Sequence, residues 1–320
     1  MTTPRQVMLW FPHSWDTAPA ADLLAAVGGQ VQDWKRTATL IPSGYEDESL
    51  TPLAHGETFA CHSYPAGRPD RLAVIARFLT LWTMDDDVSE RWGISPEYSA
   101  GVLAALRGDD VGAVDPYLRE WQALGHELRG SGLSDAWFRR LLSNFTTWHD
   151  HARLPEIGRK ESCDQYWQRR PDGTGAVAWL DFLEYVHDRE LTQEQHDTDY
   201  VRAVYVFAKQ DYVVAFNDPT SVERDERRGV PNLCSLIAQE HRISHADAAA
   251  RLAERHRAMA RRRQAEIERA RVDRPDLVWW LDLACVHHLG MARAHIPDPS
   301  RYGEQQNLPG SSFQVGVTVG

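Results

Sequence analysis

Three oxygen-bearing side chains recur at four-residue intervals in the stretch 216–226. Asn217, Ser221 and Asp225 would share one face of an α-helix, because residues four positions apart are neighbours on a helical surface. An amide oxygen, a hydroxyl and a carboxylate are the kinds of ligand that a hard cation such as Mg²⁺ prefers. An ordinary solvated helix face would show the same pattern, so the cation hypothesis needs support from elsewhere in the chain.

A second oxygen-rich cluster lies upstream, in Asp86-Asp87-Val88-Ser89-Glu90. On a helix the carboxylates of Asp86 and Glu90 would converge one turn apart and repel each other. The cluster follows an apolar helical pattern, so it lies at a helix C-terminus, where the macrodipole disfavours negative charge. A solvated acidic helix end remains an alternative, but the unfavourable charge placement indicates a compensating cation.

Two further features could bind an anion. Arg169 and Arg170 precede a break that contains Gly173, and a guanidinium offers a planar fork for phosphate oxygens. Two arginines in such a break are also typical of a solvated loop. Arg301 and Tyr302 follow the last predicted helix, and they would supply a cation and a phenolic donor if the C-terminus folds back over a cavity.

Helical periodicity dominates the elements that must position these residues. The first 60 residues are predicted to be irregular apart from a short helix near 20–27, and residues 153–175 are broken by proline and glycine. No segment shows a convincing strand pattern. The sequence therefore predicts an all-α protein with one domain over residues 1–320 and irregular or flexible termini at 1–17 and 303–320. Helices are predicted from Pro69 to near Gly93 and over 97–107, 112–129, 134–152, 177–190, 197 through the 216–226 stretch, 245–271 and 277–295.

Composition restricts the class of partner. The chain has 320 residues and a formal net charge of −11, so a nucleic acid or an anionic membrane is not expected as a partner. A phosphate-bearing ligand would need local arginines or metal ions to offset this charge. The four cysteines are far apart and indicate reduced thiols. With no signal-like or membrane-spanning run in the sequence, a cytoplasmic protein is expected.

Together these motifs resemble those of the bacterial class I terpene synthases. Residues 86–90 fit the form DDxx(D/E) of that family's Asp-rich motif, and residues 217–225 fit its second metal motif, NDxxSxx(K/R)E. Residues 166–173 are similar to the family's diphosphate-sensing segment, and residues 301–302 match its terminal Arg-Tyr pair. The four matches occur in the family's order. The resemblance implies a single-domain helical bundle around a central active-site cavity.

The resemblance also implies roles for individual residues. It implies three Mg²⁺ ions, with Mn²⁺ as an alternative, held by Asp86, Asp87, Glu90, Asn217, Ser221 and Asp225. It implies diphosphate contacts from Arg169, Arg170, Arg224, Arg301 and Tyr302. It implies a catalytic set of Asp86, Asn217, Ser221, Asp225 and Arg169. Candidates to line the cavity are Phe78, Trp82, Gly173, Trp179, Phe207 and Trp279.

The activity implied is a Mg²⁺-dependent ionisation of a prenyl diphosphate, followed by cyclisation of the carbocation to a terpene. Farnesyl diphosphate is the expected substrate and a sesquiterpene the expected product. The alternative is a diterpene synthase that takes geranylgeranyl diphosphate or a bicyclic diphosphate. A non-catalytic helical protein that retains the scaffold is an alternative of another class. A chain-elongating prenyltransferase is disfavoured because the second motif is not Asp-rich. The resemblance also allows a homodimer.

Two positions depart from the family pattern, and the choice between two arginines stays open. Asp225 is one methylene shorter than the usual glutamate. Pro219 removes a backbone donor inside the second motif, which predicts a kink or a helix break at the metal site. Arg169 fits the spacing to the following Asp-Gly pair, whereas Arg170 lies closer to the expected distance from Asn217. His287 and His288 are interpreted as packed or surface residues, not ligands.

Overall fold

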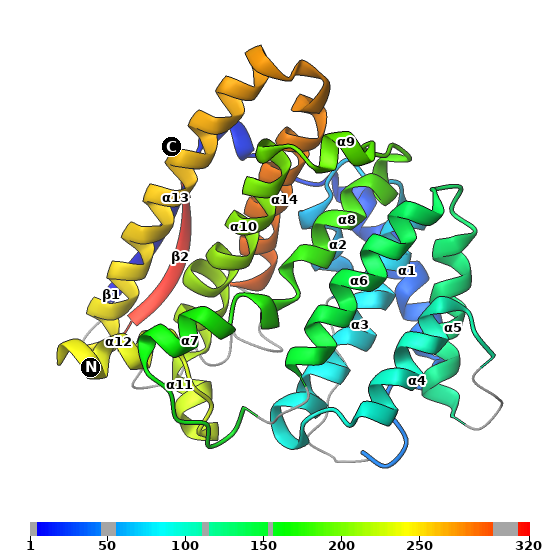
Figure 1. The fold of residues 1–320 in the computed structure, drawn as a ribbon, viewed down its shortest axis with the longest axis horizontal. Coiled ribbons are helices and arrows are strands. Elements are labelled where there is room, and N and C mark those ends of the chain that lie inside the picture. The colour runs from blue at the N-terminus through cyan, green and yellow to red at the C-terminus, as the bar shows by residue number, and fades with distance from the viewer. Residues whose placement is uncertain (1–4, 46–55, 111–114, 153–155, 297–312) are drawn as a thin grey trace. The chain divides into compact units, whose positions relative to one another are not determined.

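The computed structural model describes residues 5–45, 56–110, 115–152, 156–296 and 313–320. The chain divides into two compact units. Unit 1 comprises Met1–Ala18, Ile157–Val177 and Leu191–Gly320, and unit 2 comprises Pro19–Glu156 and Ala178–Glu190. Helices dominate both units, which confirms the predicted all-α class (Figure 1). The prediction of a single domain over residues 1–320 stays a prediction.

Unit 2 is built around the helix that carries the Asp-rich motif. This helix, α3, packs against α1, α2 and α5, while α4 packs against α5 and α6. The helices of the unit are α1 (Ala21–Lys35), α2 (Gly56–Ser63), α3 (Pro69–Trp92), α4 (Pro96–Arg107), α5 (Pro116–Arg129), α6 (Asp135–His151) and most of α8 (Ala176–His187). Gly93 has φ 73° and ends α3 at the predicted position, because glycine adopts this left-handed backbone without strain.

The core of unit 2 is an aromatic cluster. The Phe78 ring centroid lies 5.1 Å from those of Trp121 and Phe182, and Trp82 stacks on Trp179 at 4.6 Å. Each such pair contributes about 0.5–1.5 kcal/mol beyond the area that it buries. Phe78, Trp82 and Trp179 are thus buried in the interior of unit 2, and their role in lining a substrate cavity stays a prediction.

Unit 1 combines helices with two terminal strands. Its long helix α13 packs against α10, α12 and β1, and α14 packs against α10 and α13. Its elements are β1 (Arg5–Phe11), α7 (Cys163–Arg169), α9 (Gln193–His196), α10 (Asp199–Asp211), a π-helical turn (Tyr212–Asn217), α11 (Asp218–Arg228), α12 (Leu233–His241), α13 (His245–Asp273), α14 (Val278–His295) and β2 (Phe313–Val319). Short 3₁₀ turns span His13–Trp15, Asp172–Thr174 and Pro275–Leu277.

The two strands correct the prediction of irregular termini at 1–17 and 303–320. β1 and β2 pair in parallel, from Arg5 opposite Phe313 to Phe11 opposite Val319. Along β1, Val7, Leu9 and Phe11 are buried and alternate with more exposed residues, the period of a strand with one covered face. The alternation was missed because it is short and its partner strand lies at the other end of the chain.

Four short helices were also missed: α2, α9, α7 and α12. α7 lies in a region predicted to be broken, and a capping box formed by Ser162 and Gln165 starts it. α12 starts at an N-cap formed by Asn232, whose side chain accepts a hydrogen bond from the Cys234 amide. α7 and α12 are too short to give a clear periodic signal, so only their caps could have indicated them.

A buried ion cluster lies in unit 1. Asp211 Oδ2 is 2.8 Å from His256 Nδ1 and 2.6 Å from His288 Nε2. Burial would raise the pKa of Asp211, but the two histidines outweigh it and lower this pKa to about 2. His256 also contacts the Trp10 carbonyl oxygen at 2.8 Å and so fastens β1 to α13. His288 is therefore a packed residue, as predicted.

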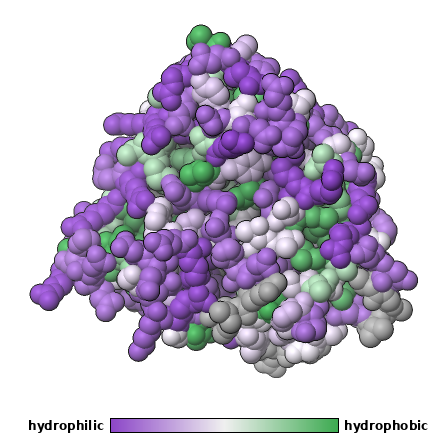
Figure 2. Space-filling model, in the orientation of Figure 1, coloured by the Kyte–Doolittle hydropathy of each residue, from purple (hydrophilic) through white to green (hydrophobic). Residues whose placement is uncertain are grey.

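The face shown in Figure 2 is mostly hydrophilic, with small hydrophobic patches between charged and polar residues. Within the described ranges, no helix is long and apolar enough to cross a membrane.

Candidate metal and diphosphate site

The second predicted metal motif begins where a π-helical segment passes into an α-helix. α10 ends at Asp211, a π-helical turn spans Tyr212–Asn217, and α11 begins at Asp218. Pro219 lies in the first turn of α11, where a missing N–H costs no helical hydrogen bond. The helical stretch continues through Pro219 without a break, and its irregularity is the π-helical segment Tyr212–Asn217 that precedes the proline; a kink here stays a prediction.

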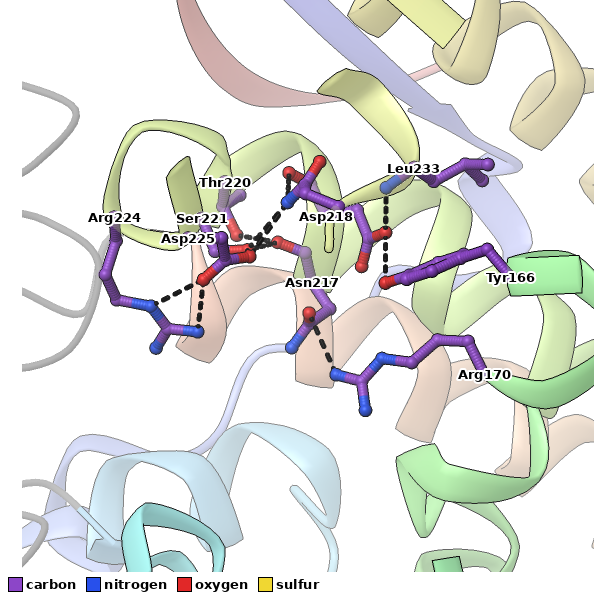
Figure 3. A network of polar contacts seen from close by, with 10 residues as sticks. Tyr166, Arg170, Asn217, Asp218, Thr220, Ser221, Arg224, Asp225 and Leu233 are labelled. Carbon is purple, nitrogen blue, oxygen red and sulfur yellow. Dashed lines mark hydrogen bonds and ion pairs between the residues drawn. The ribbon is translucent and has the colours of Figure 1, made fainter. Parts of the chain in front are cut away.

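Two of the three predicted oxygen donors, Ser221 and Asp225, are in contact beside this junction, whereas the side-chain oxygen of Asn217 accepts a hydrogen bond from Arg170 (Figure 3). Ser221 Oγ lies 2.6 Å from Asp225 Oδ2 and 2.8 Å from the Asn217 backbone oxygen. All three residues are buried. The four-residue spacing therefore brings the Ser221 and Asp225 side chains together, one turn beyond the π-helical segment in which Asn217 lies.

The carboxylate of Asp225 is held from two sides. Arg224 Nε lies 2.9 Å from Oδ1, and the same guanidinium forms a buried ion pair with this oxygen. Asn232 Nδ2 lies 2.8 Å from Oδ2. Fixed hydrogen-bond donors therefore hold the short side chain of Asp225. For Arg224 to contact a diphosphate as predicted, its guanidinium would have to leave the Asp225 carboxylate or contact both groups at once.

Asp218 fixes the start of α11. Its Oδ2 accepts hydrogen bonds from the Tyr166 hydroxyl and the Leu233 amide, both at 2.7 Å (Figure 3). Complete burial raises the pKa of Asp218 to about 6, and the nearby Arg170 charge and the two hydrogen bonds oppose this rise. This carboxylate therefore joins α7, α11 and the start of α12.

The two candidate arginines point to different partners. Arg170 Nη2 lies 3.2 Å from Asn217 Oδ1, and Nη1 lies 3.3 Å from the Gly173 carbonyl oxygen. Arg169 instead forms a two-point ion pair with Glu161, with its Nη2 2.6 Å from Oε1. One residue along a helix turns the side chain by about 100°, so neighbours cannot share a direction. The structure brings Arg170, and not Arg169, to the Asn217 motif.

Arg169 also lines an open pocket of about 420 Å³ beside α7. The pocket is open and all its lining residues are charged or carry side-chain amides, so it does not resemble the dry cavity expected around a carbocation. Its lining residues are Arg159, Lys160, Glu161, Gln165, Gln168 and Arg169.

The Asp-rich motif lies near the C-terminal end of α3 in unit 2. Asp86 and Asp87 are half-buried, and Glu90 is 8% exposed. The preceding Asp85 is fully buried, and its Oδ1 accepts hydrogen bonds from two tyrosine hydroxyls, those of Tyr98 and Tyr117. Burial raises the pKa of Asp85 to about 7, although both hydrogen bonds oppose the shift. Asp85 therefore ties this part of α3 to the interior of unit 2, whereas the carboxylates of Asp86 and Asp87 are more accessible to solvent.

The donor set around Asn217 fits a hard divalent cation. Amide, hydroxyl and carboxylate oxygens are suitable ligands, and Mg²⁺ is usually bound through one or two protein carboxylates together with substrate phosphates. Among the described residues, no group of three or more His, Cys, Asp or Glu side chains lies close enough to hold a metal ion. A metal at this motif would therefore depend on Asn217 and Ser221 as much as on Asp225.

The remaining predicted site residues are dispersed. Arg301 and Tyr302 lie outside the described residues. Gly173 is buried in a 3₁₀ turn. Phe207 packs in unit 1, with its ring centroid 4.6 Å from that of His288, and Trp279 lies in the first turn of α14. Their roles toward a substrate stay predictions.

Asn232 and Asp85 are polar site neighbours that the sequence reasoning did not select. Asn232 lies beyond the second motif, and only its position before the apolar residues of α12 could have indicated a cap. Asp85 adjoins the Asp-rich motif, but its inward direction follows from its neighbours Tyr98 and Tyr117 on other helices. Neither residue type in isolation predicts these contacts.

The chain resembles known proteins in two ways: its sequence matches the model of a protein family, and its fold is similar to solved structures. The model of terpene synthase family 2, C-terminal metal binding, matches residues 77–262, which is more than half of the chain. Comparison of the sequence with curated proteins gave no match.

Solved structures with a similar fold include three Streptomyces enzymes. One is 2-methylisoborneol synthase from Streptomyces coelicolor A3(2), in complex with Mg²⁺ and 2-fluoroneryl diphosphate, with a TM-score of 0.75, 16% identity and coverage of 92% of this chain and 96% of that one. Linalool/nerolidol synthase from Streptomyces clavuligerus has a TM-score of 0.67, 17% identity and coverage of 87% and 96%. Germacradien-4-ol synthase from Streptomyces citricolor has a TM-score of 0.68, 16% identity and coverage of 87% and 93%.

The family match covers both the Asp-rich motif and the Asn217 motif, and the helical fold agrees with it. This match favours an enzyme over a non-catalytic scaffold. The chain belongs to terpene synthase family 2 and is a class I terpene synthase of the bacterial type.

Proposed function

We propose that this terpene synthase ionises a linear prenyl diphosphate in the presence of Mg²⁺ and cyclises the resulting carbocation. The expected substrate is farnesyl diphosphate, which would give a sesquiterpene. Geranylgeranyl diphosphate or a bicyclic diphosphate is the alternative. The observation that carries the proposal is the approach of the Arg170 guanidinium to within 3.2 Å of Asn217 Oδ1, which places an anion-binding cation beside a set of hard oxygen donors.

Two groups of side chains would hold the metal. In unit 1, Asn217, Ser221 and Asp225 would bind one Mg²⁺, and Mn²⁺ could replace it. Bound Mg²⁺ would supply Lewis-acid neutralisation of the leaving diphosphate. In unit 2, Asp86 would bind two further ions, with Asp87 and Glu90 assigned to the same cluster.

Arginine side chains would orient the diphosphate. Arg170 is favoured over Arg169 because Arg169 is occupied by Glu161. A guanidinium donates from a rigid fork and keeps its charge, so it can stabilise the negative charge that develops as the C–O bond breaks. Arg224, Arg301 and Tyr302 are further diphosphate contacts in this proposal.

The structures that resemble the chain support this substrate class. The 2-methylisoborneol synthase structure holds Mg²⁺ and a fluorinated neryl diphosphate, and another structure of the linalool/nerolidol synthase holds 2-fluorogeranyl diphosphate. A dry pocket with aromatic walls would protect the carbocation from water. A homodimer and a cytoplasmic location remain further predictions for this protein.

Incubation with C10, C15 and C20 prenyl diphosphates tests the proposal. The purified protein is mixed with each substrate and Mg²⁺, and the extract is analysed by gas chromatography with mass spectrometry. We expect a cyclic C15 hydrocarbon or alcohol, which disappears when EDTA removes the metal. The proposed activity is refuted when a folded sample gives no terpene from any of the three substrates.

A matched pair of variants tests the arginine assignment. Arg170→Gln should lower kcat by about 100-fold, a typical cost of losing one donor to developing negative charge. Arg169→Gln should lower it by less than about 10-fold, because its guanidinium faces Glu161. The reverse order of the two effects would assign the diphosphate contact to Arg169.

A further inference from the structure

Asn232 connects two of the candidate metal ligands although it lies outside both motifs. It is fully buried in the connection between α11 and α12. Its Nδ2 lies 2.8 Å from Asp225 Oδ2 and 3.3 Å from Ser221 Oγ. The same nitrogen lies 2.9 Å from the Asp218 backbone oxygen. One amide group thus contacts three successive turns of the helix that carries the motif, at Asp218, Ser221 and Asp225.

The orientation of this amide is set by its other end. Oδ1 accepts a hydrogen bond from the Cys234 amide at 2.9 Å, so Nδ2 must be the atom that faces the oxygens of α11. Nδ2 carries two hydrogens, which suffice for Asp225 Oδ2 and the Asp218 carbonyl, the two shorter contacts. Capping α12 requires only the acceptor Oδ1. The two donated hydrogen bonds are therefore additional to the capping role.

These donated bonds act on the side chains that would bind the cation. The Ser221 hydroxyl has one hydrogen and two acceptors within reach, Asp225 Oδ2 and the Asn217 carbonyl oxygen. By holding Asp225 Oδ2 in place, Asn232 keeps the acceptor that orients the Ser221 hydroxyl. Partners that hydrogen-bond to a metal-ligating carboxylate orient the ligand, and their loss commonly weakens metal binding by about 10- to 100-fold.

We propose that Asn232 is a positioning residue for the Asn217 metal motif, holding Asp225 and Ser221 in the arrangement that accepts the cation. The proposal deepens the proposed function and rests on it. It also gives a reason why the short side chain of Asp225 can act as a ligand. The Arg224 guanidinium contacts Oδ1 and the Asn232 amide contacts Oδ2, so the position of the carboxylate is fixed.

Two variants separate positioning from capping. Asn232→Ser keeps a side-chain oxygen that can cap α12 but has no amide donor to reach Asp225. Asn232→Thr does the same with a larger side chain and serves as the second variant if the serine form is poorly folded. Ser244→Ala is the matched control: it removes the N-cap of α13 in the same unit, where the side chain contacts Asp247 and no candidate ligand. Circular dichroism and a thermal midpoint measured without Mg²⁺ report the folded state of each.

Calorimetric titration of Mg²⁺ in the presence of inorganic pyrophosphate gives the readout. We expect Asn232→Ser to weaken Mg²⁺ binding by about 10- to 100-fold and Ser244→Ala to leave it unchanged within experimental error. In turnover assays the half-saturating Mg²⁺ concentration should rise by the same factor, with kcat recovered at high Mg²⁺. A merely structural role would lower the folded fraction without moving the Mg²⁺ affinity of the molecules that remain folded.

Two failures can be told apart. If wild-type protein binds no Mg²⁺ with pyrophosphate, the metal site of the proposed function is wrong. If wild type binds Mg²⁺ and both folded Asn232 variants bind it equally well, only the positioning role of Asn232 is overturned.

Discussion

His149 gives a prediction whose size follows directly from its surroundings. It is fully buried on α6, between the rings of Phe145 and Trp148, with ring centroids 4.6 and 5.0 Å away. Neither of its ring nitrogens has a hydrogen-bond partner among the described residues. Burial without a partner penalises the charged imidazolium and lowers the pKa of His149 from 6.5 to about 3.

The sign of the resulting pH dependence is fixed by proton binding. Below pH 6.5 the unfolded chain binds a proton at His149 and the folded chain does not, so stability falls as the pH falls, down to about pH 3. Between pH 7.5 and pH 5.0 these two pKa values correspond to a loss of about 2 kcal/mol. His149→Leu removes the titrating group and should remove this part of the loss, whatever its effect on packing at pH 7.5.

Urea unfolding followed by tryptophan fluorescence at pH 7.5, 6.0 and 5.0 measures the effect. The quantity compared is the change in unfolding free energy between the two extreme pH values, which cancels any constant packing difference. His126→Leu is the matched control, because His126 is an exposed histidine in the same unit. The reasoning is refuted if wild type and His149→Leu lose the same free energy between pH 7.5 and pH 5.0.

Three further substitutions test the network around the motifs and the core of unit 2. Tyr166→Phe removes the hydroxyl donated to the buried Asp218 carboxylate and should lower the unfolding free energy by about 1.5–3 kcal/mol; an unchanged urea midpoint would contradict this. Arg140→Met removes the ion-pair partner of the buried Asp181 carboxylate and should lower the unfolding free energy by about 3–5 kcal/mol in urea. An unchanged unfolding free energy would show that the ion pair between Arg140 and Asp181 does not stabilise the fold. Asp225→Glu should weaken Mg²⁺ binding by about 10-fold, because the longer arm disturbs the Asn232 hydrogen bond, and equal or tighter binding in a pyrophosphate titration would show that this bond does not define the site.

The sequence predicted those parts of the site that depend on local spacing. The four-residue intervals of Asn217, Ser221 and Asp225 predict one face of a helix, and the structure joins Ser221 and Asp225 at 2.6 Å. Pro219 predicts a kink or a break because proline lacks a backbone donor, but the helical stretch continues through it. The π-helical segment over Tyr212–Asn217 depends on how α10 and α13 pack around it, and periodicity alone does not contain that information.

The parts that could not be predicted depend on contacts between distant segments. Arg169 and Arg170 differ by one position, so the direction of each depends on the helical phase of α7, which is set by the capping box at Ser162. β1 and β2 are short strands whose pairing joins residues near the two ends of the chain, from Arg5 opposite Phe313 onward. A long-range partner of this kind leaves little trace in either segment alone.

The motif of unit 1 is held in place by polar side chains because its backbone is irregular. The π-helical segment and Pro219 change the regular hydrogen-bond ladder just where the candidate ligands begin. The carboxylate of Asp218 compensates by accepting hydrogen bonds from Tyr166 on α7 and from the backbone before α12. Because α7 ends beside Arg170, the same carboxylate sets the distance between that guanidinium and Asn217. It follows that loosening this anchor should disturb the proposed diphosphate contact of Arg170 and the candidate metal ligand Asn217 together, because the two side chains are in direct contact.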